Sequence, residues 1–125
     1  VVGPVHYSYA TTEENFVTQE GLSFKALSNF VATLGAQGCS GTGGGVHYQL
    51  SKDKINWSYF NGTAWGVGTN FTTASTSAQL LAGLSTYTSA SNTVSDIAYI
   101  RAILKSDALG SAPCEVGQLQ LDGFE

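Results

Sequence analysis

The segment 46–67, which reads VHYQLSKDKINWSYFNGTAWGV, constrains the fold of this chain more than any other part of the sequence. Its first six residues alternate apolar and polar side chains, which is the period-two pattern of a half-buried β-strand. A polar turn follows, and a second strand over 57–60 leads into Asn61-Gly62. Asn-Gly between apolar runs favours a type I′ turn, because both central residues of that turn need a positive φ. The segment therefore predicts two antiparallel strands and a tight hairpin.

A two-residue loop at Asn61-Gly62 also sets the expected register of the hairpin. The expected pairs are Phe60 with Thr63, Tyr59 with Ala64, Ser58 with Trp65 and Trp57 with Gly66. One face then carries Trp57 and Tyr59, and the other carries Phe60 and Trp65. One face is expected to enter the core, and the other to be exposed unless a second layer covers it. A one-residue error in the register would exchange the two faces.

Composition favours one extracellular all-β domain over 1–125. Only 11% of the residues are charged, Met is absent, and Gly, Ser and Thr are abundant. The net charge of −4 argues against a nucleic-acid partner, which normally needs clustered Lys and Arg. No apolar run reaches the roughly 18 residues of a membrane-spanning helix, so no transmembrane segment is expected. No signal peptide is visible, so the chain is expected to be a mature product or an excised module.

The two cysteines, Cys39 and Cys114, are far apart in the sequence and form no CxxC motif. With His6 and His47 they complete no zinc-binding pattern, so neither a metal nor a cofactor is expected. A disulfide is the favoured interpretation, and two unrelated buried thiols are the alternative. A disulfide closing a loop of this length would stabilise the fold by about 4 kcal/mol in the chain-entropy model. It would also indicate an oxidising compartment.

The first part of the chain predicts further short strands. Val5, Tyr7 and Tyr9 alternate with less apolar residues, as expected of a strand at a sheet edge. The segment 16–34 is interpreted as two or three short strands. A helix over 26–34 is the alternative, because four apolar residues there also fit helical spacing.

The rest of the chain continues this pattern. Six glycines in 35–45 predict a loop, which is not a phosphate-binding loop because it runs straight into a strand. A short helix is expected over 78–84, capped from 75–77. The most apolar strand is expected over 96–105, and a final strand over 115–121. About eight short strands and at most one helix predict an antiparallel β-sandwich of jelly-roll type.

Catalysis has little support in the sequence. No pair of carboxylates carries a glycosidase signature, and no GxSxG or HExxH motif is present. His6 and His47 fall on expected strands, where packed or surface histidines are commoner than catalytic ones. Asp107 and Asp122 lie near expected loops but belong to no calcium-binding run. The chain is therefore not expected to be an enzyme.

Ligand binding has better support than catalysis. Aromatic faces can stack on sugar rings while amides bond the hydroxyl groups. The candidate residues for a glycan or cell-surface ligand are Trp57, Tyr59, Trp65, Asn61 and Gln49. The competing interpretation places both tryptophans in the core. Asn56, Asn61 and Asn70 each begin an N-x-S/T triplet, which matters only where the glycosylation machinery exists.

The central segment resembles β-sandwich modules of large bacterial surface and adhesin-like proteins. The shared pattern is YQLSxDxxxWxYxNGxAW, matched here by residues 48–51, Asp53, Trp57, Tyr59, 61–62 and 64–65. The stretch 101–107, RAILKSD, is similar to their penultimate strand and its turn. The loop 108–113 and the two cysteines depart from the pattern and suggest a locally stapled variant. The resemblance implies an extracellular, non-catalytic module of a fibre, adhesin or other surface assembly.

Three functions follow, in order of preference. The first is assembly or adhesion, in which the strand over 5–10 pairs with another subunit, because unpaired strand edges are templates for strand addition. The second is a carbohydrate-binding module that uses Trp57, Tyr59 or Trp65. The third is a small hydrolase, which would need a carboxylate pair in a cleft.

Overall fold

A computed structural model of the chain describes residues 6–8, 14–18, 21–38, 45–88, 95–105 and 114–124. At 6–8, 14, 34–38 and 114–118 it describes the backbone alone. The described residues hold nine strands, one α-helix and two 3-10 turns, and all strand pairs are antiparallel. The predicted all-β class is therefore confirmed. The finer assignment to a jelly-roll-like sandwich stays a prediction.

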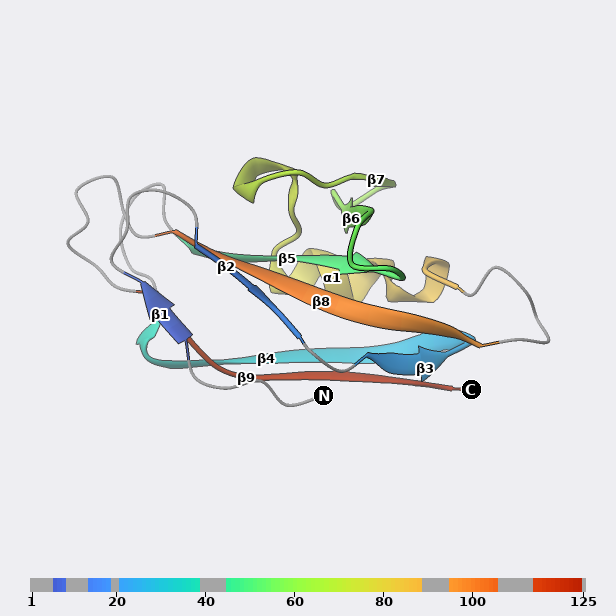
Figure 1. The fold of residues 1–125 in the computed structure, drawn as a ribbon, viewed down its shortest axis with the longest axis horizontal. Coiled ribbons are helices and arrows are strands. Elements are labelled where there is room, and N and C mark those ends of the chain that lie inside the picture. Colours follow the sequence, from blue (N-terminus) through green and yellow to red (C-terminus); the bar gives the residue numbers. More distant parts are fainter. Residues whose placement is uncertain are drawn as a thin grey trace.

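The strands form two sheets, which Figure 1 shows as two layers. The three-stranded sheet has the order β1-β9-β4, with β1 (His6–Ser8), β9 (Cys114–Phe124) and β4 (Ala26–Gly38). The six-stranded sheet has the order β2-β8-β5-β6-β7, with β2 (Glu14–Val17), β8 (Asp96–Lys105), β5 (Gly45–Ser51), β6 (Trp57–Phe60) and β7 (Trp65–Val67). Its sixth strand, β3 (Leu22–Phe24), pairs with β8 beyond the end of β2.

Strand β8 is an interior strand of the six-stranded sheet, as its apolar sequence predicted. Its alternate residues Ala98, Ile100, Ala102 and Leu104 are all buried in the main core. They face that core because successive side chains of a strand point to opposite sides. β5 pairs along one edge of β8, while β2 and β3 share the other edge.

The main core receives side chains from both sheets and from one helix. The helix α1 (Ser77–Gly83) begins at the N-cap Thr76, whose hydroxyl accepts from the backbone of Gln79. It contacts β4 of one sheet and β5 and β6 of the other, together with the turn η2 (Leu84–Thr86). The core residues are Phe24, Leu27, Phe30, Tyr48, Leu50, Leu80, Leu84, Ala98, Ile100, Ala102, Leu104, Leu119 and Leu121. The short helix expected over 78–84 is thus confirmed, shifted by one residue.

The alternative helix over 26–34 is wrong, because this segment is the first part of β4 and pairs with β9. A register irregularity lies between Leu27 and Asn29. A β-bulge of this kind adds one residue on one strand, so side chains with an odd spacing can share a face. Leu27 and Phe30 are both buried for this reason, although three positions separate them. The bulge therefore accounts for the Leu27–Phe30 part of the spacing that imitated a helix, while Val31 is 43% exposed.

Two expected boundaries also change. The glycine-rich loop was expected over 35–45, but β4 continues to Gly38 and β5 begins at Gly45. The last strand was expected to end at Leu121, but β9 continues through Asp122 to Phe124. In both places a glycine that suggested a turn lies within or at the end of a paired strand.

The hairpin at Asn61-Gly62 is confirmed, but its expected register is wrong by two residues. The observed pairs are Phe60 with Trp65, Tyr59 with Gly66 and Ser58 with Val67. Asn61 Oδ1 accepts hydrogen bonds from the Thr63 backbone and hydroxyl and from the Ala64 backbone, each at 2.9 Å. The side chain of Asn61 thus stabilises a four-residue loop, in which only Gly62 has a positive φ, of 105°. Because the shift is an even number, the two predicted faces keep their members.

Two sets of predicted residues fall partly outside the described part of the chain. Val5 and Tyr9 lie outside it, and the backbone of Tyr7 lies in β1. Cys39 lies outside it, and only the backbone of Cys114 is described. The register pairs Cys114 with Gly38, the residue before Cys39 in the sequence. The disulfide itself stays a prediction.

Candidate functional site

Trp57 and Gln49 belong to a covered polar layer on the outer face of the six-stranded sheet. Trp57 is only 7% exposed, and the guanidinium carbon of Arg101 lies 4.6 Å from the centre of its ring. Arg101 Nε donates to Gln49 Oε1 at 2.7 Å, and Arg101 Nη2 donates to the same oxygen. Gln49 Nε2 in turn donates to the carbonyl oxygen of Thr73 at 2.7 Å. A fully buried amide and a cation on an aromatic face stabilise each other here.

Residues 68–75 form the cover over this layer. Phe71 stacks on the ring of His47 at 4.0 Å, and His47 Nδ1 donates to the Phe71 carbonyl oxygen at 2.9 Å. Phe71 and Ala74 also form a small apolar cluster with Ile103 of β8. At Gly68 a Cβ atom would lie 2.5 Å from Gln49 Nε2, so the cover fits closely only with glycine at this position.

Trp65 lies on the opposite face of the hairpin, against the main core. Its ring is half-buried between Phe60, at 5.5 Å between ring centres, and Tyr87, at 4.9 Å. Its Nε1 donates to the Thr86 hydroxyl at 2.8 Å and to the Gly83 carbonyl oxygen at 3.2 Å. The indole of Trp65 therefore already has its polar and apolar partners within the chain. Tyr87, one of these partners, is itself largely buried, and this burial, with Coulombic contributions from Asp53 and Asp96, raises the pKa of its hydroxyl above its usual range.

Four of the five binding candidates take part in packing or hydrogen bonds within the chain, and the five do not lie together on one exposed platform. Trp57 and Gln49 are buried, Trp65 packs on the core, and Asn61 stabilises the hairpin loop. Tyr59 is half-buried, with its ring edge near Gly66. The main core covers Phe60 and part of Trp65 on one face of the hairpin, Trp57 is buried on the other face, and Val67 is 77% exposed.

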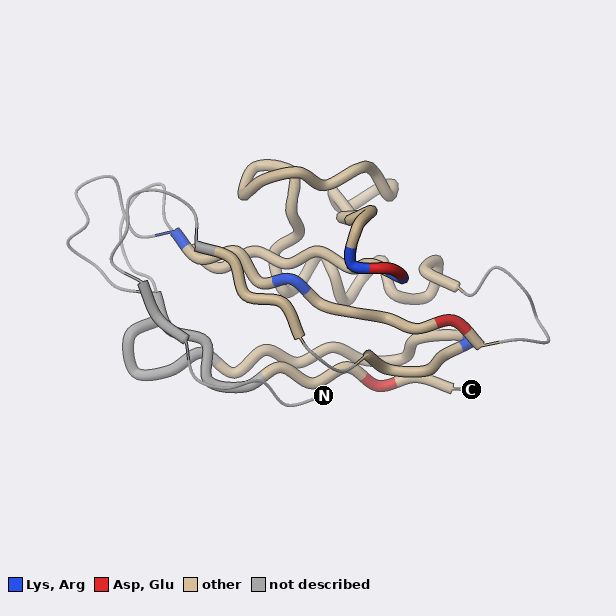
Figure 2. Tube along the Cα trace, in the orientation of Figure 1, with Lys and Arg blue, Asp and Glu red and all other residues tan. Residues whose placement is uncertain are grey.

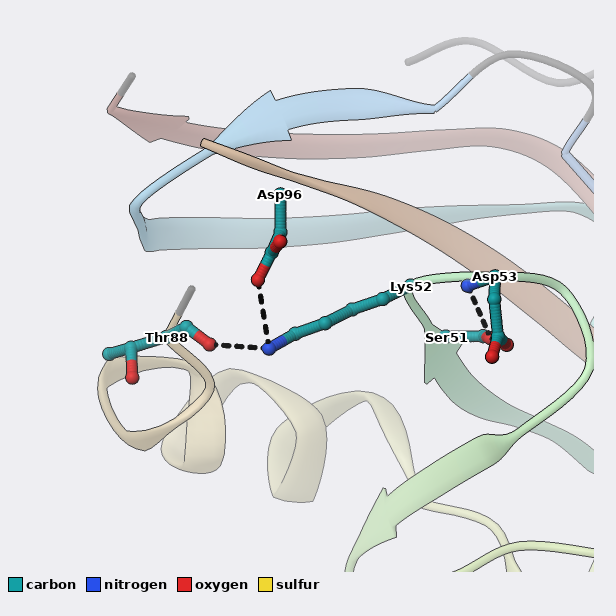
Figure 3. Close-up of polar contacts among 5 residues, drawn as sticks. All are labelled: Ser51, Lys52, Asp53, Thr88 and Asp96. Atoms are coloured by element: carbon teal, nitrogen blue, oxygen red, sulfur yellow. Dashed lines mark hydrogen bonds and ion pairs between the residues drawn. The ribbon is translucent and has the colours of Figure 1, made fainter. Parts of the chain in front are cut away.

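A polar cluster around Lys52 connects the β5–β6 turn to the first residue of β8 and to Thr88, which follows η2 (Figure 3). Lys52 Nζ lies 3.2 Å from Asp96 Oδ2 and donates to the Thr88 carbonyl oxygen at 2.8 Å. It also lies 5.5 Å from the centre of the Tyr87 ring. About a third of each charged side chain is exposed, so the ion pair contributes about 0–1 kcal/mol. Lys52 therefore connects three segments that are far apart in the sequence.

The same turn is fixed by Asp53. Its carboxylate accepts hydrogen bonds from the Ser51 hydroxyl, from the backbone of Ile55 and from the backbone and side chain of Asn56, at 2.8–2.9 Å. These bonds, led by the one from the Asn56 backbone, hold the pKa of Asp53 well below its usual range. Lys54 takes a left-handed backbone conformation with a φ of 63°. The turn is therefore ordered by one ionised side chain.

We expect Asp53→Asn to remove an acid-sensitive part of the stability. The folded-state pKa of Asp53 is lowered, so its stabilisation is complete above the unfolded value of about 3.9 and is lost as the pH falls further. At neutral pH the variant should unfold at lower urea concentration than the natural chain. Below about pH 4 the difference should shrink. Urea unfolding over this pH range measures it, and a difference that stays constant with pH would contradict the assignment.

Among the described residues no three His, Cys, Asp or Glu side chains are grouped as metal ligands would be. No helix in the described part of the chain is long and apolar enough to cross a membrane. Figure 2 shows the few charged residues spread along the fold instead of gathered on one face.

Sequence reasoning missed two residues that organise this region. Arg101 is one of them, and its position inside the most apolar strand of the chain was the available signal. Ser75 is the other: it is fully buried, and its hydroxyl bonds both backbone groups of Phe60. Nothing in the local sequence around Ser75 distinguishes it from the other serines of its polar, Thr-rich stretch.

No protein family, curated protein or solved structure matches this chain.

Proposed function

We propose that the chain is a non-catalytic extracellular module that works by assembly or adhesion, as a subunit or domain of a surface fibre. The observation that carries this proposal is the place of β1. It is the edge strand of the three-stranded sheet and pairs with β9 through only three residues, His6, Tyr7 and Ser8. Its outer edge has no partner strand among the described residues. An edge of this kind can accept a strand from another chain.

Two further observations favour assembly over the alternatives. The aromatic residues that suggested a sugar platform are used in packing, which weakens the carbohydrate-binding alternative at Trp57 and Trp65. The backbone of Cys114 lies opposite Gly38, so a bond from Cys114 to Cys39 would fix β9 to β4 beside β1. Such a disulfide belongs to an oxidising, extracellular setting.

Proline substitutions in β1 test the proposal. In an antiparallel ladder, hydrogen-bonded and non-hydrogen-bonded pairs alternate, so the N–H groups of His6 and Tyr7 point to opposite sides. One of His6→Pro and Tyr7→Pro therefore removes a bond to β9, and the other removes only a group on the open edge. We expect the open-edge variant to abolish the assembled species in light scattering without lowering the melting temperature. The other variant should lower it.

Deleting residues 1–10 should likewise abolish assembly and leave a folded core. The same sample under non-reducing conditions gives the mass that reports the Cys39–Cys114 bond. A natural chain that is monomeric at high concentration, or proline variants that both assemble normally, would contradict the proposal.

A further inference from the structure

The outer face of the three-stranded sheet carries a group of side chains that the core does not use. In Figure 1 this sheet is the layer farthest from β6 and β7. The register pairs Asn29 with Asp122 and Val31 with Gln120. Their neighbours Phe30, Leu119 and Leu121 point into the core and are buried. The paired residues therefore point outward, because side chains alternate along a strand.

The polar members of this face present one carboxylate and two amides. Gln120 Nε2 donates to Asp122 Oδ2 at 3.0 Å, and Asn29 Nδ2 is 3.5 Å from the same oxygen. Each amide thus directs its NH2 group at the carboxylate. What remains for a ligand is Asp122 Oδ1 and the two amide carbonyl oxygens, which accept hydrogen bonds, together with the second N–H of each amide, which donates. The two amides also hold the carboxylate in place before any ligand arrives.

An aromatic ring lies at the end of this acceptor row. Phe124 is 65% exposed and follows Asp122 by two residues on β9, so its Cα lies about 7 Å farther along the same side of the strand. Val31 is 43% exposed and lies across from Gln120. A single exposed apolar residue is ordinary on a protein surface. An exposed ring beside a fixed carboxylate offers both a stacking face and hydrogen-bond acceptors.

These features complement a neutral glycan. Sugar hydroxyls donate to carboxylate and amide oxygens, and the C–H face of a pyranose covers an aromatic ring. The charged side chain within the row is Asp122, which repels an anionic ligand, while Lys25 lies beside Phe124 at the end of the row, where its backbone N–H donates to the Phe124 carbonyl oxygen. We infer that the outer face of β4 and β9 binds a neutral glycan, with Phe124 stacking on a sugar ring and Asp122 accepting its hydroxyl hydrogen bonds. This inference is independent of the assembly through β1 and places sugar binding away from Trp57 and Trp65.

Affinity electrophoresis of the whole chain tests the inference. The gels contain hydroxyethylcellulose, galactomannan, xyloglucan or yeast mannan as neutral probes, or alginate as an anionic one. We expect at least one neutral probe to retard the natural chain, and alginate not to do so. Phe124→Ala and Asp122→Asn should each weaken the association constant at least tenfold. Asp122→Asn keeps the side-chain shape, so its loss of binding reports the lost negative charge and the replacement of one acceptor oxygen by an NH2 group.

A matched control is Ile55→Ala. Ile55 is 79% exposed on the β5–β6 turn, away from the three-stranded sheet, and its loss should leave retardation unchanged. Melting curves confirm that each variant is folded. The inference is overturned if no neutral probe retards the chain, if alginate binds more strongly, or if folded Phe124→Ala and Asp122→Asn bind as the natural chain does. Loss of binding in Tyr59→Ala alone would move the site to the hairpin and overturn it as well.

Discussion

Replacing Ser75 with alanine is expected to lower the free energy of unfolding by about 2–4 kcal/mol. Ser75 is fully buried between β5 and β6. Its backbone forms a bridge with Tyr48, with N–H to carbonyl bonds of 2.7 and 2.8 Å. Its hydroxyl accepts from the Phe60 backbone N–H at 2.7 Å and donates to the Phe60 carbonyl oxygen at 2.9 Å.

The size of the effect follows from what the alanine variant leaves behind. Tyr48 keeps its bonds, because they involve only the backbone of residue 75. Phe60 loses the partner of its N–H and of its carbonyl group, and both contacts with the hydroxyl are buried. Each buried backbone group without a partner costs about 1–3 kcal/mol, and the small cavity left by the hydroxyl adds little.

Urea unfolding of Ser75→Ala beside Ser77→Ala measures this loss. Ser77 is exposed at the first residue of α1, so its replacement should change the free energy of unfolding by less than about 0.5 kcal/mol. The comparison separates the buried hydroxyl from serine in general. If Ser75→Ala also stays within that range, water or a backbone shift satisfies Phe60, and Ser75 does not join the two strands.

The extent to which this fold was predictable differs between local and distant interactions. β5, β8 and β9 were found because their apolar residues alternate, and β6 because it leads into Asn61-Gly62, and these signals are local in the sequence. The predicted register of the hairpin was wrong because Asn-Gly is typical of a two-residue turn. Here the Asn61 side chain instead stabilises a four-residue loop through its hydrogen bonds with Thr63. Both outcomes use the same dipeptide, and the choice depends on the residues that follow it.

The candidate site was harder to predict than the fold. The sequence showed that Trp57 and Trp65 lie on opposite faces, but it did not show what covers either face. Trp57 is covered by Arg101, which lies 44 positions later in the chain, and Trp65 by α1 and Tyr87. The exposed group around Asp122 depends on the β4–β9 register, which includes a bulge that no local pattern reveals.

Gly83→Ala should be destabilising, opposite to the usual effect of this change in a helix. Alanine is favoured over glycine by up to about 1 kcal/mol within a helix, and Gly83 is the last residue of α1. Here a Cβ atom would lie 2.4 Å from Cγ and 2.8 Å from Cβ of Phe60. These are the atoms nearest the Phe60 backbone, so a rotation of the ring does not relieve the clash. The helix or β6 would have to move.

Such a movement would disturb several contacts at once, because the Gly83 carbonyl oxygen accepts from Trp65 Nε1 at 3.2 Å and from the Thr86 hydroxyl at 2.8 Å. We expect a net loss of about 1–2 kcal/mol, which is the upper part of the range for an overpacked core, about 2–3 kcal/mol, less a helix preference of about 1 kcal/mol. Thermal unfolding of Gly83→Ala beside Ala82→Gly tests this. Ala82 is exposed, so its change to glycine should cost only about 0.5–1 kcal/mol by helix preference alone. The two opposite substitutions at neighbouring positions should therefore both destabilise. A stabilised Gly83→Ala variant would mean that α1 does not press against β6 at this point, and that Trp65 is held by its ring contacts alone.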